Sequence, residues 1–245
     1  MTTLIITMAG YGKRLESYAP GTPKPYLNLA GKPSLIWALS SFELSCFSKI
    51  IFITSRNIFK FQDPILIFKQ MIPYDIKAEC VILESVPNGQ ALSLREGLLQ
   101  SDVPTSFCVF NCDTVMDRVD HDWLTQVSGN NGALGVFPSA NPTLSYVKVN
   151  STNAVTETAE KKIISNWASS GLYWFKSKSI FLDLNFECEQ ESEEIYIAPL
   201  FNQMIKFGQP VVAITNSNVF PIGTVSEIEK FLESPMYTKL VNEKK

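Results

Sequence analysis

An apolar run that leads into a glycine turn constrains the fold of this chain most strongly. Residues 4–8 read Leu-Ile-Ile-Thr-Met without regular polar alternation, which predicts a strand buried on both faces. Two glycines follow, and glycine lets the backbone turn sharply while leaving its N–H groups uncovered. Arg14 and Lys24 then add fixed positive charge. Together these features predict a triphosphate-binding loop made of Met8, Ala9, Gly10, Tyr11, Gly12 and Lys13.

Two common phosphate-binding loops fit this segment poorly. A Walker loop ends in Gly-Lys-Ser/Thr, and Gly12-Lys13-Arg14 lacks the hydroxyl that binds magnesium. A dinucleotide-binding loop needs a third glycine where this chain has Leu15. An NADP-dependent oxidoreductase stays open as an alternative, because Arg56 follows the expected second strand and could meet a 2′-phosphate.

A third pattern, G-x-G-x-R followed by P-K-P, matches better. It is carried by Gly10, Gly12, Arg14, Pro23, Lys24 and Pro25, and through it the chain resembles the sugar-1-phosphate nucleotidyltransferase family. The resemblance implies that Arg14 neutralises the leaving pyrophosphate and that Lys24 neutralises the α-phosphate, so both are expected to be catalytic. The family also has a Gly-x-Ala turn that helps select the nucleobase, and Gly89, Gln90 and Ala91 match it.

Repeated strand and helix patterns predict the fold class. Buried strands are expected at 49–54, 77–83 and 107–113, and helices over 35–42, over 58–71 and after Asn88, a plausible helix N-cap. This β-α-β order predicts a Rossmann-like, doubly wound and mostly parallel α/β sheet. From Gly132 the strands become short and closely spaced, which predicts antiparallel additions.

The expected metal site lies at the end of the fourth strand. Asp113 follows that strand directly, and strand ends at one edge of a parallel sheet share a ligand crevice. The resemblance implies the same role, which makes Asp113 the expected Mg²⁺ ligand. Asp117, Asp120 and Asp122 are interpreted as solvated. Many family members have a second metal-binding Asp two residues before a Gly-Thr pair, where this chain has Pro221.

The second half of the chain carries the acceptor side of the resemblance. The family has a Glu-Lys pair, in which Glu contacts acceptor hydroxyls and Lys contacts the acceptor phosphate, and later a Gly-hydrophobe-Tyr strand. The corresponding residues here are Glu160, Lys161 and Gly171. Because a Glu-Lys-Lys trio is common on solvated surfaces, this assignment depends on its flanking match.

Composition excludes several other classes of protein. The chain has 245 residues, of which 45% are hydrophobic. Its net charge of −3 does not indicate the basic surface that binds nucleic acid. Five scattered cysteines and a single histidine make a structural zinc site improbable. We expect a cytoplasmic protein without a membrane partner, since no basic leader or run of about 20 apolar residues is present.

These observations predict one nucleotidyltransferase domain over residues 1–235, with a nucleotide-binding half (1–130), an acceptor-binding half (131–235) and a C-terminal tail (236–245). The expected reaction transfers NMP from an NTP to a phosphorylated small molecule, most simply a sugar 1-phosphate for surface polysaccharide synthesis, and releases pyrophosphate. A cytidylyltransferase acting on a non-sugar phosphate such as phosphocholine, and a non-catalytic nucleotide-binding regulator, remain alternatives. The sequence leaves the nucleobase and the oligomeric state open.

Overall fold

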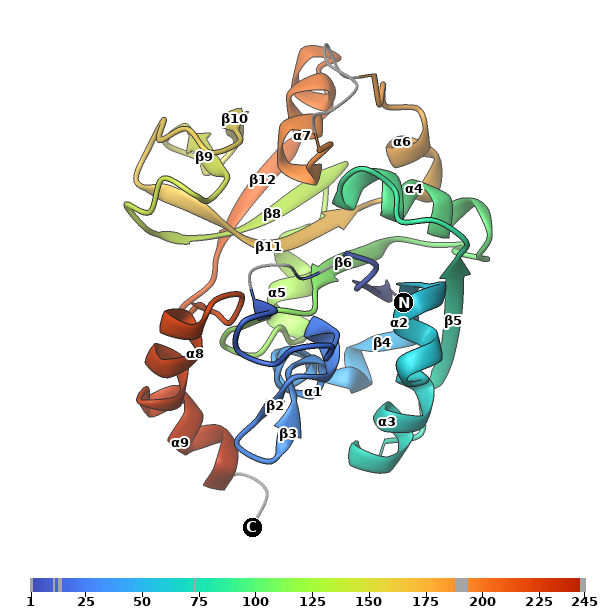
Figure 1. The fold of residues 1–245 in the computed structure, drawn as a ribbon. Coiled ribbons are helices and arrows are strands. Elements are labelled where there is room, and N and C mark those ends of the chain that lie inside the picture. The colour runs from blue at the N-terminus through green and yellow to red at the C-terminus, as the bar shows by residue number, and fades with distance from the viewer. Residues whose placement is uncertain (1, 11, 13–14, 73, 188–193, 243–245) are drawn as a thin grey trace.

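A nine-stranded sheet organises the computed structural model, which describes residues 2–10, 12, 15–72, 74–187 and 194–242 (Figure 1). Its main path runs β10-β9-β11-β6-β1-β4-β5; off this path, β8 pairs with β11, and β12 pairs with β8. The predicted site residues Tyr11, Lys13 and Arg14 lie outside the described residues. The mixed sheet confirms the predicted fold class.

Four parallel strands form the half of the chain that the sequence predicts to bind the nucleotide. β1 (Thr2–Thr7) lies between β4 (Phe47–Ser55) and β6 (Phe107–Asn111), and β5 (Lys77–Leu83) extends the sheet beyond β4. Leu4 and Ile6 belong to the core on one face of the sheet, whereas Ile5 belongs to the core on the other. This alternation explains why an apolar run without polar alternation forms the central strand.

Helices cover both faces of these strands. α4 (Gln90–Leu99) packs on one face, while α1 (Ser34–Leu39) and α3 (Pro64–Met71) contribute to the core of the other face. The helix predicted over 58–71 is in fact two helices, because Asp63 caps α3 after α2 (Arg56–Phe61) has ended. The helix expected over 35–42 ends at Leu39, and every residue of α1 is buried.

The second half adds antiparallel strands, as predicted. β11 (Trp167–Phe175) joins the halves, since it pairs antiparallel with both β6 and β8 (Gly132–Pro138). The remaining strands are β9 (Tyr146–Val149), β10 (Val155–Ala159) and β12 (Val211–Thr215), with β12 parallel to β8. α7 (Ile197–Lys206) covers this part on the same side as α4 and α6 (Lys178–Leu182) (Figure 1).

The C-terminal segment closes a third core beside α1. α8 (Val225–Leu232) begins at Thr224, whose side chain accepts from Glu227 N, as expected of a cap. Phe231 of α8 packs edge-on against Trp37 of α1. α9 (Pro235–Asn242) follows, so the segment expected only as a tail contains a helix. The short elements are β2 (Asn28–Leu29), β3 (Lys32–Pro33), β7 (Thr114–Val115), β13 (Phe220–Pro221), α5 (His121–Gln126) and 3₁₀ turns at Lys24–Tyr26 and Leu44–Cys46.

Two acidic residues interpreted as solvated are instead engaged. Asp120 caps α5 by accepting from Trp123 N at 3.0 Å, and Asp117 accepts from the Asn218 amide at 2.8 Å. Only Asp122 is exposed as expected. Through the described ranges, no helix has the length and apolar character needed to cross a membrane.

Candidate functional site

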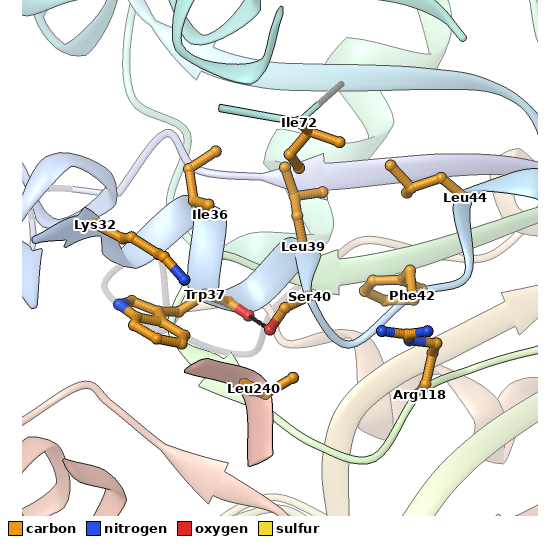
Figure 2. Close-up of a pocket in the computed structure, with 10 residues that line it drawn as sticks. All are labelled: Lys32, Ile36, Trp37, Leu39, Ser40, Phe42, Leu44, Ile72, Arg118 and Leu240. Atoms are coloured by element: carbon orange, nitrogen blue, oxygen red, sulfur yellow. Dashed lines mark hydrogen bonds between the residues drawn. The ribbon is translucent and has the colours of Figure 1, made fainter. Parts of the chain in front are cut away.

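A cleft of about 790 Å³ opens at the carboxyl edge of the parallel strands. Both halves of the chain line it, and the lining includes ten predicted site residues: Met8, Ala9, Gly10, Gly12, Lys24, Gly89, Gln90, Asp113, Glu160 and Lys161. A smaller cavity of about 250 Å³ lies between α1 and α9 and shares no lining residue with the cleft (Figure 2). The structure therefore gathers nearly all the predicted site residues that it describes into one cleft.

Lys24 and Asp113 form an ion pair at one end of the cleft. The Lys24 ammonium donates directly to Asp113 Oδ2, and the two side chains are only 15% and 17% exposed. Lys24 begins a 3₁₀ turn that Pro23 precedes and Pro25 continues. Gly12 has a φ of +64°, and a Cβ at this position would lie 2.9 Å from Lys24 Cβ. The glycine therefore allows the loop to pack directly on the lysine segment.

A second carboxylate, Glu227, lies near this ion pair. A Cβ built on Gly223 would be 3.1 Å from Asp113 Oδ2 and 3.5 Å from Glu227 Oε2. Glu227 Oε2 accepts from Gly223 N at 3.0 Å, one residue before the N-cap Thr224, and in the sequence Glu227 is the last residue of a T-x-x-E capping pattern that begins at Thr224. Sequence reasoning missed Glu227 because that pattern indicates only a helix start.

These carboxylates fit a magnesium ion in kind and number. Across the described ranges, no three His, Cys, Asp or Glu side chains gather as a metal cluster. Magnesium usually takes only one or two protein carboxylates and keeps several waters, so Asp113, with or without Glu227, matches the number of carboxylates that this ion requires. The Lys24 ammonium already lies against Asp113, which shows that this carboxylate attracts a cation.

The turn before α4 forms another wall of the cleft. Gly89, not Asn88 as expected, is the N-cap residue of α4, and its φ of +110° favours glycine. A Cβ on Gly89 would lie 2.4 Å from both the N and the O of Ile195, so the backbones approach closely here. Gln90 Nε2 donates to Thr7 Oγ1 at 2.8 Å, which connects this turn to the end of β1.

Five side chains meet where the segments after β10 and before α7 reach the cleft. Lys161 Nζ donates to the Tyr196 hydroxyl at 2.7 Å and lies 3.9 Å from Glu160 Oε1. The Tyr196 hydroxyl in turn donates to Glu194 Oε2, and Ser145 Oγ donates to Glu160 Oε2. Burial raises the pKa of the Glu160 carboxyl, and the hydrogen bond to Tyr196 raises the pKa of Lys161. Neither Glu194 nor Tyr196 carries a motif that sequence reasoning could detect.

Gly171 is placed beside the cleft and not in its lining. Its φ is +80°, and a Cβ there would meet the Asn111 amide nitrogen at 2.8 Å. Asn111 does line the cleft, at the carboxyl end of β6. Its buried Oδ1 lacks a hydrogen-bond partner among the described atoms. Gly171 thus makes room for a cleft residue that sequence reasoning missed.

The cleft presents charged side chains in fixed positions. Among the described residues, its lining contains no activated nucleophile. Cys112 lines it, but burial raises the pKa of this thiol to about 12, which keeps it protonated near pH 7. His121 begins α5 and lies outside the lining. Arg56, the basis of the NADP alternative, also lies outside the lining and pairs with Glu84 on the surface. The arrangement suits neutralisation of phosphate charge.

Comparisons with known proteins agree with this geometry. A family model described as nucleotidyl transferase matches residues 3–234. The catalytic subunit beta of mannose-1-phosphate guanylyltransferase from Drosophila pseudoobscura is 25% identical in an alignment 237 residues long, which covers 85% of this chain and 60% of that protein. The chain thus spans 60% of the length of this relative.

Solved structures share the fold over nearly the whole chain. A nucleoside-diphosphate-sugar pyrophosphorylase from Vibrio cholerae superimposes with a TM-score of 0.81 at 26% identity, covering 94% of this chain and 100% of its own. The inositol-1-phosphate CTP transferase of T. maritima gives a TM-score of 0.73 at 17% identity, with 96% and 97% covered. At that identity the second likeness shows the fold alone.

Proposed function

The chain belongs to the nucleotidyl transferase family, and from this premise we propose that it transfers NMP from an NTP to a phosphorylated small molecule and releases pyrophosphate. A sugar 1-phosphate is the acceptor class best supported. The relatives from Drosophila and Vibrio are named for sugar phosphates and nucleotide sugars. Activation of a building block for surface polysaccharide is the corresponding proposed role.

One observation supports this proposal: a single cleft is lined by two lysines from distant parts of the chain, Lys24 and Lys161, and each could bind a phosphate. Lys24 lies at the end formed by the glycine loop, and Lys161 lies at the end formed by β10 and α7. The walls between them come from the Gly89 turn and from the end of β6. A triphosphate at the first end and a phosphorylated acceptor at the second would share the space between.

The reaction needs no strong general base. An acceptor phosphate is largely ionised near pH 7, so its oxygen can attack the α-phosphorus in line while pyrophosphate leaves. Catalysis is then positioning together with charge neutralisation. Lys24 would neutralise the α-phosphate. The resemblance assigns Arg14 to the pyrophosphate, and this residue lies outside the described part of the chain.

We propose Mg²⁺ as the cofactor, with Asp113 as its principal protein ligand and Glu227, on the other side of Gly223, as a second carboxylate. When bound, the ion would neutralise phosphate charge. Asp113 would hold it at the carboxyl edge of β6. Lys24 would leave Asp113 and turn toward the nucleotide, since the two groups contact each other in the structure.

A cytidylyltransferase that acts on a non-sugar phosphate is the second candidate. Two carboxylates, Glu160 and Glu194, lie around Lys161, which is the lysine of the described lining in this part of the cleft. This negative charge favours an acceptor with a positive group, such as phosphocholine. The T. maritima neighbour is named for a cytidylyl reaction, although its likeness extends only to the fold.

The test is pyrophosphate release from the purified protein with magnesium, each common NTP or dTTP, and a panel of hexose 1-phosphates and other small phosphates. Release with one nucleotide–acceptor pair is expected, and Asp113→Asn should reduce it at least about a hundredfold. Asp122→Asn is the matched control, because Asp122 is exposed on α5 and outside the cleft. Nucleotide binding without release from any pair would favour the regulatory alternative.

A further inference from the structure

Resting on the proposed function, we infer that Tyr173 of β11 is a positioning residue for the reaction. Together with Ser169 and Ser145 it forms a directed series of hydrogen bonds that fixes the carboxylate of Glu160 in the wall of the cleft. Glu160 lines the cleft, whereas the other three residues lie outside the lining. They act on the site from behind its wall, through Glu160.

The hydrogen-bond series begins at the backbone of Gly171 and ends at the Glu160 carboxylate. The Gly171 N–H donates to Ser169 Oγ at 3.1 Å, and the Ser169 hydroxyl donates to the Tyr173 hydroxyl at 3.1 Å. The Tyr173 hydroxyl is also hydrogen-bonded to the hydroxyl of Ser145, which in turn donates to Glu160 Oε2. Successive hydrogen bonds thus connect the backbone of β11 to the cleft.

The two ends give the hydrogen-bond series a single direction. A backbone N–H can only donate, and an ionised carboxylate can only accept. Because the Ser145 proton goes to Glu160, Ser145 can only accept from Tyr173, so the tyrosine is the donor. Burial raises the pKa of Tyr173 to about 12, so this hydroxyl keeps its proton near pH 7. Hydrogen bonds aligned in this way polarise and strengthen one another.

An irregularity in β11 brings these groups together. The pairing of β11 with β8 shifts register between Ser169 and Tyr173, and Gly171 within this interval has a φ of +80°. Ser169 N also donates to Ser145 O at 2.8 Å, which places the segment before β9 beside β11. Tyr173 is only 4% exposed, and its ring stacks on Phe201 with the centroids 5.9 Å apart. The hydrophobic core therefore holds the ring that carries the hydroxyl.

Glu160 needs this support because its carboxylate is largely shielded from water. Its side chain is only 18% exposed, and burial raises its pKa. The hydrogen bond from Ser145 and the charge of Lys161 oppose this effect, whereas the charge of Glu194 adds to it. Tyr196 also faces this group of charges, through its hydrogen bond with Lys161. Donors that converge on the carboxylate favour its ionised form.

The hydrogen-bond series occupies one oxygen of Glu160 and leaves the other for a ligand. Oε2 accepts from Ser145, while Oε1 lies 3.9 Å from the Lys161 ammonium in the lining of the cleft. A carboxylate that is already fixed loses little conformational freedom when a substrate hydroxyl binds to it. Loss of the Tyr173 hydroxyl should therefore weaken binding of the acceptor and not of the nucleotide.

A tyrosine hydroxyl that only satisfies itself in the core is bonded differently. Tyr26 is 6% exposed, and its hydroxyl donates to the backbone carbonyl of Gln62 at 2.6 Å. This bond ends on a peptide group outside the lining of the cleft. Tyr26→Phe is therefore the matched control for the removal of a buried tyrosine hydroxyl.

The first experiment measures the pKa of Glu160 by ¹³C NMR of the full chain labelled at the glutamate carboxyl, with Glu160→Gln to identify the resonance. Ser145→Ala, Tyr173→Phe and Ser169→Ala should each raise this pKa. The rise should decrease in that order, because each hydroxyl lies one bond further from the carboxylate. Tyr26→Phe should leave the pKa unchanged. An unchanged value in both Tyr173→Phe and Ser169→Ala would overturn the inference.

A double variant distinguishes a connected series from independent contacts. If Tyr173 acts on Glu160 only through Ser145, then Ser145→Ala combined with Tyr173→Phe should give the same Glu160 pKa as Ser145→Ala alone. Additive rises would show that the tyrosine affects the carboxylate by another route, and the hydrogen-bond series would be wrong. A loss of packing common to both variants would lower stability without producing this pattern.

Kinetics then connect the hydrogen-bond series to the reaction. With the nucleotide–acceptor pair that gives pyrophosphate release, Tyr173→Phe should raise KM for the acceptor about fivefold, as expected for one weakened hydrogen bond, and leave KM for the nucleotide unchanged. Equal changes in both KM values would contradict the positioning role. The absence of release with every pair would overturn the proposed function and the role in the reaction, while the NMR titration, which needs no substrate, would still test the hydrogen-bond series.

Discussion

Two lysines at opposite edges of the same sheet show how position decides role. Lys24 lies at the carboxyl edge and pairs with Asp113, and Lys49 lies near the start of β4, at the amino edge, and pairs with Glu79 at 3.1 Å. Their side chains are 15% and 9% exposed. Burial and pairing alone would therefore not distinguish Lys24, which we propose to be catalytic, from a structural lysine such as Lys49.

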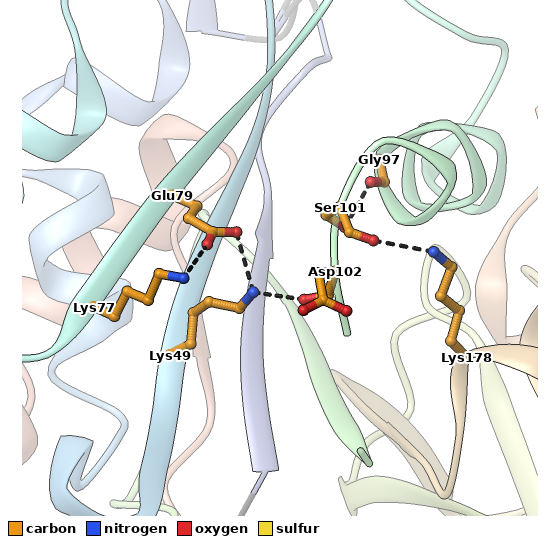
Figure 3. Close-up of polar contacts among 7 residues, drawn as sticks. All are labelled: Lys49, Lys77, Glu79, Gly97, Ser101, Asp102 and Lys178. Atoms are coloured by element: carbon orange, nitrogen blue, oxygen red, sulfur yellow. Dashed lines mark hydrogen bonds and ion pairs between the residues drawn. The ribbon is translucent and has the colours of Figure 1, made fainter. Parts of the chain in front are cut away.

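The surroundings of the two lysines make the difference. Lys49 also donates to the Asp102 carbonyl at 2.5 Å, and Lys77 shares Glu79 with it (Figure 3). Neither Lys49 nor Glu79 lines the cleft. Lys24, by contrast, opens onto that cleft beside the glycine loop. In parallel sheets ligands bind at the carboxyl edge, so the amino-edge lysine remains to connect strands and loops.

Replacement of Lys24 should give the largest effect. Lys24→Met removes the charge that neutralises phosphate in the transition state, so kcat should fall by about 10²–10³-fold. The melting temperature should change little by comparison, which thermal unfolding followed by circular dichroism can check. A variant that keeps its full rate would remove Lys24 from the mechanism and erase the contrast between the two edges.

Replacement of Lys49 should show the opposite pattern. Lys49→Met removes a buried hydrogen-bonded charge and leaves the Asp102 carbonyl with one donor fewer, so the free energy of unfolding should fall by about 1–3 kcal/mol. Activity per folded molecule should stay unchanged. Lys77→Met is the control, because its exposed ammonium contacts the same Glu79 and its loss should not be measurable. Denaturant unfolding measures the difference.

Replacement of Gly89 tests whether the carboxyl edge tolerates any side chain. Gly89→Ala would place a Cβ 2.4 Å from the Ile195 backbone at a φ of +110°, and should lower stability by about 1–3 kcal/mol and impair binding of both substrates. Gly208→Ala measures the cost of a positive φ alone, because Gly208 has a φ of +70° and a Cβ added there would have nothing within 4 Å. Similar losses in both variants would show that the contact with Ile195 contributes nothing.

A pH effect on stability should be the smallest. Burial raises the pKa of Glu160 above the ordinary 4.5, so the folded state loses stability relative to the unfolded state as pH rises through the raised value. Glu160→Gln cannot ionise and should melt slightly higher than the natural protein at pH 7. The difference should disappear below pH 4.5, which melting curves across pH can follow. A lower melting temperature at pH 7 would mean that the contacts with Ser145 and Lys161 outweigh the burial.

Local sequence patterns predicted the nucleotide half well. The strand over 77–83 has the expected bounds, and the apolar runs around residues 4–8, 49–54 and 107–113 form the other three parallel strands. The patterns of β1, β4 and β6 are reliable because strands buried on both faces consist almost entirely of apolar residues, whereas β5 is a partly exposed edge strand. The helix over 58–71 was wrong because the segment has no clear period, and Pro64 begins a new helix within it.

The acceptor half depended on contacts between distant segments. Glu160 and Lys161 were predicted from the family resemblance. Tyr196 and Glu194, which meet them in the structure, lie far along the chain, since Lys161 and Tyr196 are 35 residues apart in the sequence. No local pattern signals such a meeting. Asn111 was missed for a similar reason, because its importance comes from the space that Gly171 leaves on a neighbouring strand.

The sequence by itself determined the family and the parallel strands and was enough to propose the phosphate-binding residues, because each depends on residue types at short, regular spacing. Only the tertiary structure decided which charges face one another: Lys24 with Asp113, Lys161 between Glu160 and Tyr196, and Lys49 with Glu79 at the far edge. The physical reason is that electrostatic interaction depends on distance and burial, and both are properties of the folded chain.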